Sequence, residues 1–159
     1  MKRFWAFLVA VALCFCLVGC DSPAKETENK TYGLNETATL SDLKFTASEL
    51  KESEGATYFE PEEGNVFVGV KFTVENVSDE EQTLSSLLAF EAYVDDVKCD
   101  YSISAAMAFD EGTVDGTIAP GKKLVGWYAL EVPKTWSALD VQIQPNLLSN
   151  KKIEFHFEK

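Results

Sequence analysis

A single histidine limits the catalytic chemistry that this 159-residue sequence could carry. An imidazole that acts as a general base needs a nucleophile on one side and an orienting carboxylate on the other, inside a cleft. His156 instead alternates with Lys152, Glu154 and Glu158 near the end of the chain, which predicts a place on the polar face of a strand. We therefore expect a surface histidine, no catalytic residues and no enzymatic activity.

Carboxylates are the other abundant side chains that could do chemistry, and they gather in two segments. The segment 52–63 is rich in glutamate and is typical of a solvated, self-repelling loop. Asp110, Glu111 and Asp115 have the acidic spacing of a calcium loop but lack its alternating oxygen ligands and terminal glutamate. One histidine and one lone cysteine in the domain cannot assemble an ordinary zinc site. We expect no metal and no cofactor, with a small ligand or Ca²⁺ at residues 110–115 as the open alternative.

The overall charge excludes one large class of partners. The chain has 14 Lys+Arg against 26 Asp+Glu, a formal net charge of -12 and a pI near 4.5. Nucleic-acid binding depends on neutralising phosphates with lysine and arginine, so we expect no nucleic-acid partner. With 46% apolar and 25% charged residues, the composition is that of a globular protein.

The N-terminus has the features of a targeting segment. Two basic residues precede an apolar run over residues 4–18, which at roughly 15 residues is shorter than a membrane-spanning helix requires. The run ends in the sequence Leu17, Val18, Gly19, Cys20. This ending resembles the bacterial lipobox in residue type, in order and in distance from the N-terminus. Ordinary signal-peptidase cleavage, with an incidental cysteine, is the alternative.

The lipobox resemblance implies a defined modification. Cys20 Sγ would receive a diacylglycerol thioether, and the bond between Gly19 and Cys20 would be cleaved. Because each buried CH2 contributes about 0.8 kcal/mol, two or more acyl chains hold a protein stably at a bilayer. We therefore expect a protein that is lipid-anchored through Cys20 on the extracytoplasmic face of a bacterial cell membrane.

Three parts follow along the chain: a signal peptide over residues 1–19, a lipidated cysteine and flexible tether over 20–34, and one domain over 35–159. The tether is predicted because residues 21–34 are polar and contain Pro23 and Gly33, so they cannot bury enough apolar surface to fold. Cys99 is the one cysteine left in the domain, which excludes an internal disulfide. Its alternation with Val97 and Tyr101 predicts a small buried side chain rather than a reactive thiol.

Period-two alternation of apolar residues recurs through the domain and predicts strands. The clearest strands are residues 65–76, 122–132, 139–143 and 153–157, and weaker patterns indicate strands at 37–40 and 43–47. Residues 90–94 and 97–103 suggest a hairpin closed by Asp95 and Asp96, while residues 84–93 also fit a short helix. Pro120 and Gly121 fit a type II turn. Seven to nine short strands indicate an all-β, antiparallel immunoglobulin-like β-sandwich.

Several of these motifs together resemble a known family. The matching features are the long strand that ends at Asn76 with Ser78 after it, the Pro120 turn, Gly126 in the next strand, and Val132 before Pro133. They resemble the immunoglobulin-like domain of unknown function found in many bacterial lipoproteins, which is similar in fold to the immunoprotective extracellular antigen of mycobacteria. The resemblance covers residues 35–159 and implies a fold rather than an activity. Asp96 departs from the glycine that is usual in the family hairpin.

Apolar side chains on the outer faces of two strands suggest a recognition surface. Phe67 points away from the Val66 series, and Val125 and Trp127 point away from the Leu124 series. Trp136 could join them at one end. An outer face should be polar, so these residues predict either a covering segment or an exposed patch.

These observations favour a lipid-anchored, extracytoplasmic binding or scaffolding module without catalysis. Its partners would be the membrane, through Cys20, and an unidentified protein or small ligand. A small-ligand or divalent-metal-binding accessory lipoprotein of the cell envelope is the alternative.

Overall fold

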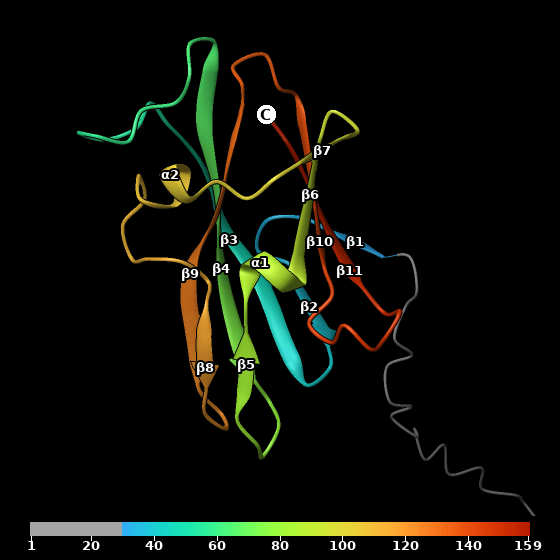
Figure 1. The fold of residues 1–159 in the computed structure, drawn as a ribbon. Coiled ribbons are helices and arrows are strands. Elements are labelled where there is room, and N and C mark those ends of the chain that lie inside the picture. The colour runs from blue at the N-terminus through green and yellow to red at the C-terminus, as the bar shows by residue number, and fades with distance from the viewer. Residues whose placement is uncertain (1–29) are drawn as a thin grey trace, which may run out of the picture.

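The computed structural model describes residues 30–159, so Gly19, Cys20 and the predicted signal peptide lie outside the described residues. Residues 30–159 form eleven strands and two short helices. The strands make two facing sheets, which confirms the predicted all-β sandwich (Figure 1). Within this part of the chain, no helix has the length and apolar character needed to cross a membrane.

The first sheet has the strand order β1-β11-β10-β6-β7. Its strands are β1 (Thr31–Tyr32), β6 (Phe90–Val94), β7 (Val97–Cys99), β10 (Ala138–Ile143) and β11 (Ile153–Glu158). All neighbours are antiparallel except β1, which pairs in parallel with the start of β11.

The second sheet has the order β2-β3-β4-β9, and a separate pair joins β5 to β8. The strands of the second sheet are β2 (Thr37–Leu40), β3 (Leu43–Ser53), β4 (Asn65–Asn76) and β9 (Lys123–Pro133). The small pair consists of β5 (Gln82–Leu84) and β8 (Gly116–Ile118). Two helices of one turn each, α1 (Ser86–Ala89) and α2 (Ile103–Ala106), lie in the connections.

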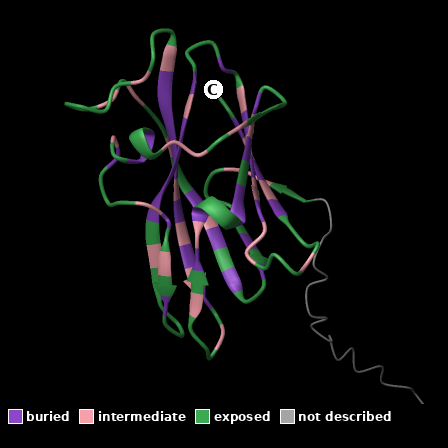
Figure 2. Ribbon diagram, viewed as in Figure 1, coloured by how far each residue is buried: buried purple, intermediate pink, exposed green. Residues whose placement is uncertain are grey.

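Strand β4 lies inside the second sheet and pairs with β9 at its edge, and each of the two strands carries an apolar face. Their register runs from Asn65 opposite Pro133 to Glu75 opposite Lys123, as the two alternating patterns require. Val66, Val70 and Phe72 face the first sheet, where they meet side chains such as Phe155. Figure 2 shows buried residues along the facing strands of both sheets, which marks the main core.

Both turns predicted from the sequence are present. The β6–β7 hairpin turns at Asp95 and Asp96, with φ of 48° and 67°, the left-handed values of a type I′ turn. Asp96 therefore adopts the conformation for which the family usually uses glycine, as aspartate can do at modest cost. Gly121 has a φ of 68°, and Lys122 N–H donates to the Ala119 carbonyl at 3.0 Å, as the Pro120 turn predicts.

Asn76 ends β4 and is fully buried. Its Nδ2 donates to the carbonyls of Glu80 and Ile118 at 2.7 and 2.8 Å, and its Oδ1 accepts from Ser78 N–H and Oγ–H at 2.9 and 2.7 Å. One amide therefore satisfies four buried or half-buried groups from two connections. This explains the Asn76 and Ser78 pattern that the family resemblance includes.

The number of strands and several boundaries differ from the sequence predictions; β3, for example, was expected over 43–47 and runs over Leu43–Ser53. Eleven strands exceed the expected seven to nine, because β1, β5 and β8 are too short to show a period. The tether does not continue to Leu34, since Thr31 and Tyr32 pair with β11 and the Tyr32 ring lies 5.6 Å from that of Phe155. The strand expected over 97–103 stops at Cys99, and the chain then turns into α2.

Candidate functional site

The predicted apolar recognition patch is not exposed. Phe67 is fully buried and Trp127 is 4% exposed, so the prediction of an exposed patch is wrong for both residues. They belong to a second, small core on the outer face of β4 and β9, together with Ala105, Ala106 and Phe109. The connection between β7 and β8 covers them, which was the alternative explanation of their apolar outer face.

Residues 101–115 of this connection form a cover segment over the outer face of β4 and β9. It is fastened to β9 at both ends: Ser102 N–H donates to the Ala129 carbonyl at 3.1 Å, and Trp127 N–H donates to the Gly112 carbonyl at 2.9 Å. Between these points the Phe109 ring stacks on Trp127 with 4.8 Å between centroids. In Figure 1, α2 accordingly lies against the outer side of β4 and β9.

The other two residues of the predicted patch do not join Phe67 and Trp127. Trp136 is 3% exposed and belongs to the main core, where its Nε1–H donates to Glu52 Oε1 at 2.6 Å. Val125 remains 41% exposed on β9. An isolated exposed valine is ordinary for a protein surface and marks no recognition site.

Two of the three acidic residues of the cover segment, Glu111 and Asp115, have polar partners. Asp115 accepts hydrogen bonds from Ser86 N–H at 2.6 Å and from Ser86 Oγ–H, which ties the segment to α1. Glu111 forms an ion pair with Lys71. Among residues 30–159, no three His, Cys, Asp or Glu side chains are grouped closely enough to hold a metal ion. The contacts of Asp115 and Glu111 therefore give the cover segment a role in packing.

Cys99 has the environment of a structural thiol. It is half-buried, and its Sγ–H donates to the Glu131 carbonyl at 3.5 Å. Burial, together with the nearby Asp100 and Glu131 carboxylates, raises the pKa of the Cys99 thiol. The thiol is accordingly protonated at neutral pH, as the prediction of an unreactive thiol requires, although Cys99 is half-buried rather than buried.

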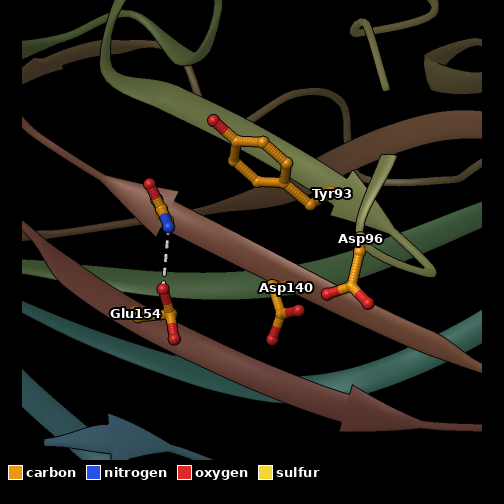
Figure 3. A pocket seen from close by; sticks show the side chains of 5 residues that line it. Tyr93, Asp96, Asp140 and Glu154 are labelled. Atoms are coloured by element: carbon orange, nitrogen blue, oxygen red, sulfur yellow. Dashed lines mark hydrogen bonds between the residues drawn. The ribbon is translucent and has the colours of Figure 1, made fainter. Parts of the chain in front are cut away.

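A shallow cavity on the outer face of the first sheet brings polar residues from three strands together. Tyr93, Asp96, Asp140, Gln142 and Glu154 line it, and its volume is about 300 Å³. Figure 3 shows the Tyr93 ring on one side, with the Asp96, Asp140 and Glu154 carboxylates arranged along the other. The cavity is open to solvent, and three of its five lining side chains are acidic.

Strand register explains why these side chains meet. Asp140 of β10 lies directly between Tyr93 of β6 and His156 of β11, and Gln142 lies beside Glu154. All these residues occupy outward positions that alternate with core residues, so they share one face. Asp96 reaches the same surface from the β6–β7 turn.

Hydrogen bonds hold the polar groups of this face in place. Gln142 Nε2–H donates to Glu154 Oε2 at 2.8 Å, and Lys152 Nζ donates to Gln142 Oε1 at 2.8 Å. His156 Nδ1 lies 2.6 Å from Asp140 Oδ1. The hydrogen bond to Asp140 raises the pKa of His156, an effect that the Glu158 and Glu154 charges strengthen and partial burial weakens.

Such an arrangement favours binding a positively charged group. The carboxylates can accept hydrogen bonds from an ammonium or guanidinium group, and the Tyr93 ring offers a flat face beside them. Among the described residues, the hydrogen bonds and ion pairs of His156 go to carboxylates and to no hydroxyl or thiol. In the described part of the chain, His156 therefore acts as a charge partner of Asp140.

This acidic surface was not predicted from the sequence, because the surface depends on the order of the strands in the sheet. The alternation in 139–143 and 153–157 predicted that Asp140, Gln142, Glu154 and His156 are outward-facing. It could not show that β10 lies between β6 and β11, which brings Tyr93 and Asp96 beside them.

Comparison with protein families identifies the domain. A family described as a domain of unknown function, DUF4352, matches residues 32–153. The chain belongs to this family. A search of curated protein sequences found no significant match. Family membership and the β-sandwich confirm the resemblance that the Asn76, Pro120 and Gly126 motifs indicated.

Solved structures share this fold at low sequence identity. A candidate lipoprotein (ycdA) from Bacillus subtilis is 15% identical with a TM-score of 0.64, over 77% of this chain and 38% of that one. This chain thus spans well under half of that protein's length. The secreted protein MPT63 of Mycobacterium tuberculosis is 18% identical with a TM-score of 0.54, over 82% of this chain and 97% of that one. A β-sandwich protein from Clostridium difficile covers 86% of this chain and 100% of its own length, with 15% identity and a TM-score of 0.54.

Proposed function

We propose that this protein is a lipid-anchored binding module on the extracytoplasmic face of a bacterial cell membrane, without catalytic activity. The lipobox resemblance that ends in Gly19 and Cys20 supports the anchor. Two proteins of the same fold, one described as a lipoprotein and one as secreted, are consistent with this location. The module would be held at the membrane through Cys20 and would present its domain to a partner.

The observation that carries the binding role is the acidic cavity on the outer face of the first sheet. Asp96, Asp140 and Glu154 come from separate elements and line one open surface beside Tyr93. An open, acidic and prearranged surface of this kind fits a cationic group on a partner, such as a lysine or arginine side chain. The partner class we propose is therefore a protein with a basic recognition segment.

The test is affinity capture of the natively lipidated protein from its own cells, with mass spectrometry of bait and co-purifying proteins. Two variants remove charge at the cavity, Asp96→Asn and Glu154→Gln, and asparagine retains the left-handed turn conformation of residue 96. Glu60→Gln removes an exposed charge from the β3–β4 loop and is the matched control.

We expect acyl mass on Cys20 and a partner that is lost with both cavity variants but kept with Glu60→Gln. A partner retained by both cavity variants would overturn the cavity as the binding surface. A lipidated bait without any protein partner would overturn the protein-partner role in favour of a small cationic ligand, and an unmodified Cys20 would overturn the anchor.

A further inference from the structure

Four leucines are exposed at one end of the sandwich. Leu87 and Leu88 on α1 are 71% and 63% exposed, and Leu147 and Leu148 in the β10–β11 loop are 61% and 99% exposed. Leu88 and Leu147 line one cavity of about 180 Å³, so the two pairs are neighbours. The Ala89 carbonyl also accepts a hydrogen bond from Gln144 N–H at 2.7 Å, which joins the two segments. These four leucines are named here the leucine end.

The loop that carries two of these leucines is held by its own polar groups. Asn146 Oδ1 accepts from Leu148 N–H at 3.0 Å, and the Asn146 carbonyl accepts from Ser149 N–H at 3.0 Å. Gln144 Nε2–H donates to the Ser149 carbonyl at 2.5 Å. The loop thus satisfies much of its backbone internally while Leu147 and Leu148 point outward, which suits an apolar environment.

The leucine end differs in charge from the rest of this acidic protein. Residues 141–153 contain two lysines and no carboxylate, and residues 84–90 contain no charged side chain at all. Glu91 borders the same cavity, but its carboxylate is paired with Lys98 Nζ at 2.8 Å. Asp115, which accepts hydrogen bonds from Ser86, is the other carboxylate beside α1. Because these two segments carry no carboxylate of their own, the repulsion that a net charge of -12 would cause at an anionic bilayer is reduced at this end.

The chain enters the described domain beside the same loop. Strand β1 is parallel to β11, with Thr31 opposite Glu154, so Lys30 lies next to the end of the β10–β11 loop (Figure 1). Ten peptide links separate Cys20 from Lys30, so the two residues can lie at most about 35 Å apart. A lipid on Cys20 would therefore keep the leucine end close to the bilayer.

We propose that the leucine end is a membrane-docking surface, with Leu147 and Leu148 inserted into the lipid headgroup region. This proposal rests on the lipid anchor of the proposed function, because the anchor makes weak insertion an intramolecular event with a high effective concentration. Docking would fix the orientation of the domain, with the β6–β7 turn directed away from the membrane.

The experiment places an environment-sensitive fluorophore on residue 148 of the full, natively lipidated protein in phosphatidylethanolamine/phosphatidylglycerol vesicles. Leu148→Cys is labelled in a Cys99→Ala background, and Val97→Cys is the matched control. Val97 is 69% exposed at the opposite end of β6 from α1. Quenching by doxyl-labelled lipids and by aqueous iodide is measured for both positions, and mass spectrometry reports acylation of Cys20.

We expect a blue-shifted emission that doxyl lipids quench at residue 148, and a water-like emission that iodide quenches at residue 97. Equal iodide quenching at both positions on an acylated protein would overturn docking but leave the anchor intact. Shielding at residue 148 without quenching by doxyl lipids would overturn the bilayer as occupant in favour of a protein contact. An unacylated Cys20 would overturn the anchor, and docking with it.

Discussion

Gly126 lies where the cover segment approaches β9 too closely for a side chain. A Cβ at this position would lie 2.2 Å from the Thr113 carbonyl oxygen and 2.6 Å from Val114 N. The contact is backbone to backbone and is held by a hydrogen bond from Val114 N–H to the Trp127 carbonyl at 3.2 Å. Glycine is therefore required here by space, and the family resemblance at Gly126 has a physical cause.

We predict that Gly126→Ala lowers the free energy of unfolding by about 1–3 kcal/mol, the usual cost of inserting a methyl group into a packed site. Urea denaturation followed by circular dichroism measures the change. Gly33→Ala is the control, because a Cβ there would have its nearest neighbour at 3.9 Å. Equal stability of the two variants would contradict the proposed steric role.

The pKa of His156 reports the electrostatics on the outer face of the first sheet, where the acidic cavity lies. Its hydrogen bond to Asp140 raises the pKa of the imidazole above the ordinary value of 6.5. Because the folded-state pKa is the higher one, the stabilisation is complete below pH 6.5 and is lost as pH rises through the folded-state pKa. The pair is partly exposed, so the effect on stability is less than about 1 kcal/mol.

The pKa of His156 can be measured by NMR titration, since the chain has a single histidine and one set of imidazole signals. We expect a midpoint above 6.5 in the parent protein and a lower midpoint in Asp140→Asn. A parent midpoint at or below 6.5 would show that Asp140 does not stabilise the charged ring.

At the scale of elements, the cover segment decides what the outer side of β4 and β9 presents. Its Phe109 ring is 7% exposed and packs on Trp127 and over Gly69, where an added Cβ would meet both rings within 3 Å. One aromatic side chain from a connection therefore turns an apolar strand face into a small core.

Phe109→Ala should remove this packing and cost about 3 kcal/mol of unfolding free energy, with a red shift of tryptophan emission as Trp127 becomes hydrated. Urea denaturation and steady-state fluorescence give the two readouts. Met107→Ala in the same segment is the control, because Met107 is 60% exposed and should change stability by less than about 0.5 kcal/mol. An unshifted emission in Phe109→Ala would mean that the cover segment does not depend on this ring.

At the scale of the whole molecule, the charge imbalance dominates the electrostatics. The chain carries a net charge of -12, and its surface ion pairs, such as Lys134 with Glu54 at 2.9 Å, are exposed and contribute little. Self-repulsion among like charges destabilises the compact state and is screened by salt. Added salt should therefore stabilise this domain although it weakens individual ion pairs.

We expect the melting temperature to rise as NaCl increases from about 0.01 to 0.5 M, a range over which the Debye length falls from about 30 Å to a few Å. A variant with Glu60→Gln, Glu62→Gln and Glu63→Gln removes three exposed charges from one loop and should show a smaller rise. A melting temperature that falls with salt would mean that the ion pairs outweigh the net repulsion.

The amino-acid sequence by itself determined the longer strands and the two predicted turns of this protein, because these depend on local periodicity and on backbone conformation. The alternation over 65–76 and the Pro120–Gly121 pair each led to the observed element. The sequence also indicated that Asp140, Gln142 and Glu154 face outward. It therefore identified the sandwich and the family resemblance, and it supplied the lipobox on which the proposed anchor rests.

Only the tertiary structure decided what lies beside each strand face. Phe67 and Trp127 have the same alternation whether they are exposed or covered, and the cover segment reaches them from a connection whose own sequence has no period. Tyr93 and Asp140 are distant in the chain and meet because β6 pairs with β10. Pairing order and the path of connections follow from long-range packing, which no local pattern encodes. For that reason both the acidic cavity and the leucine end emerged from the folded domain.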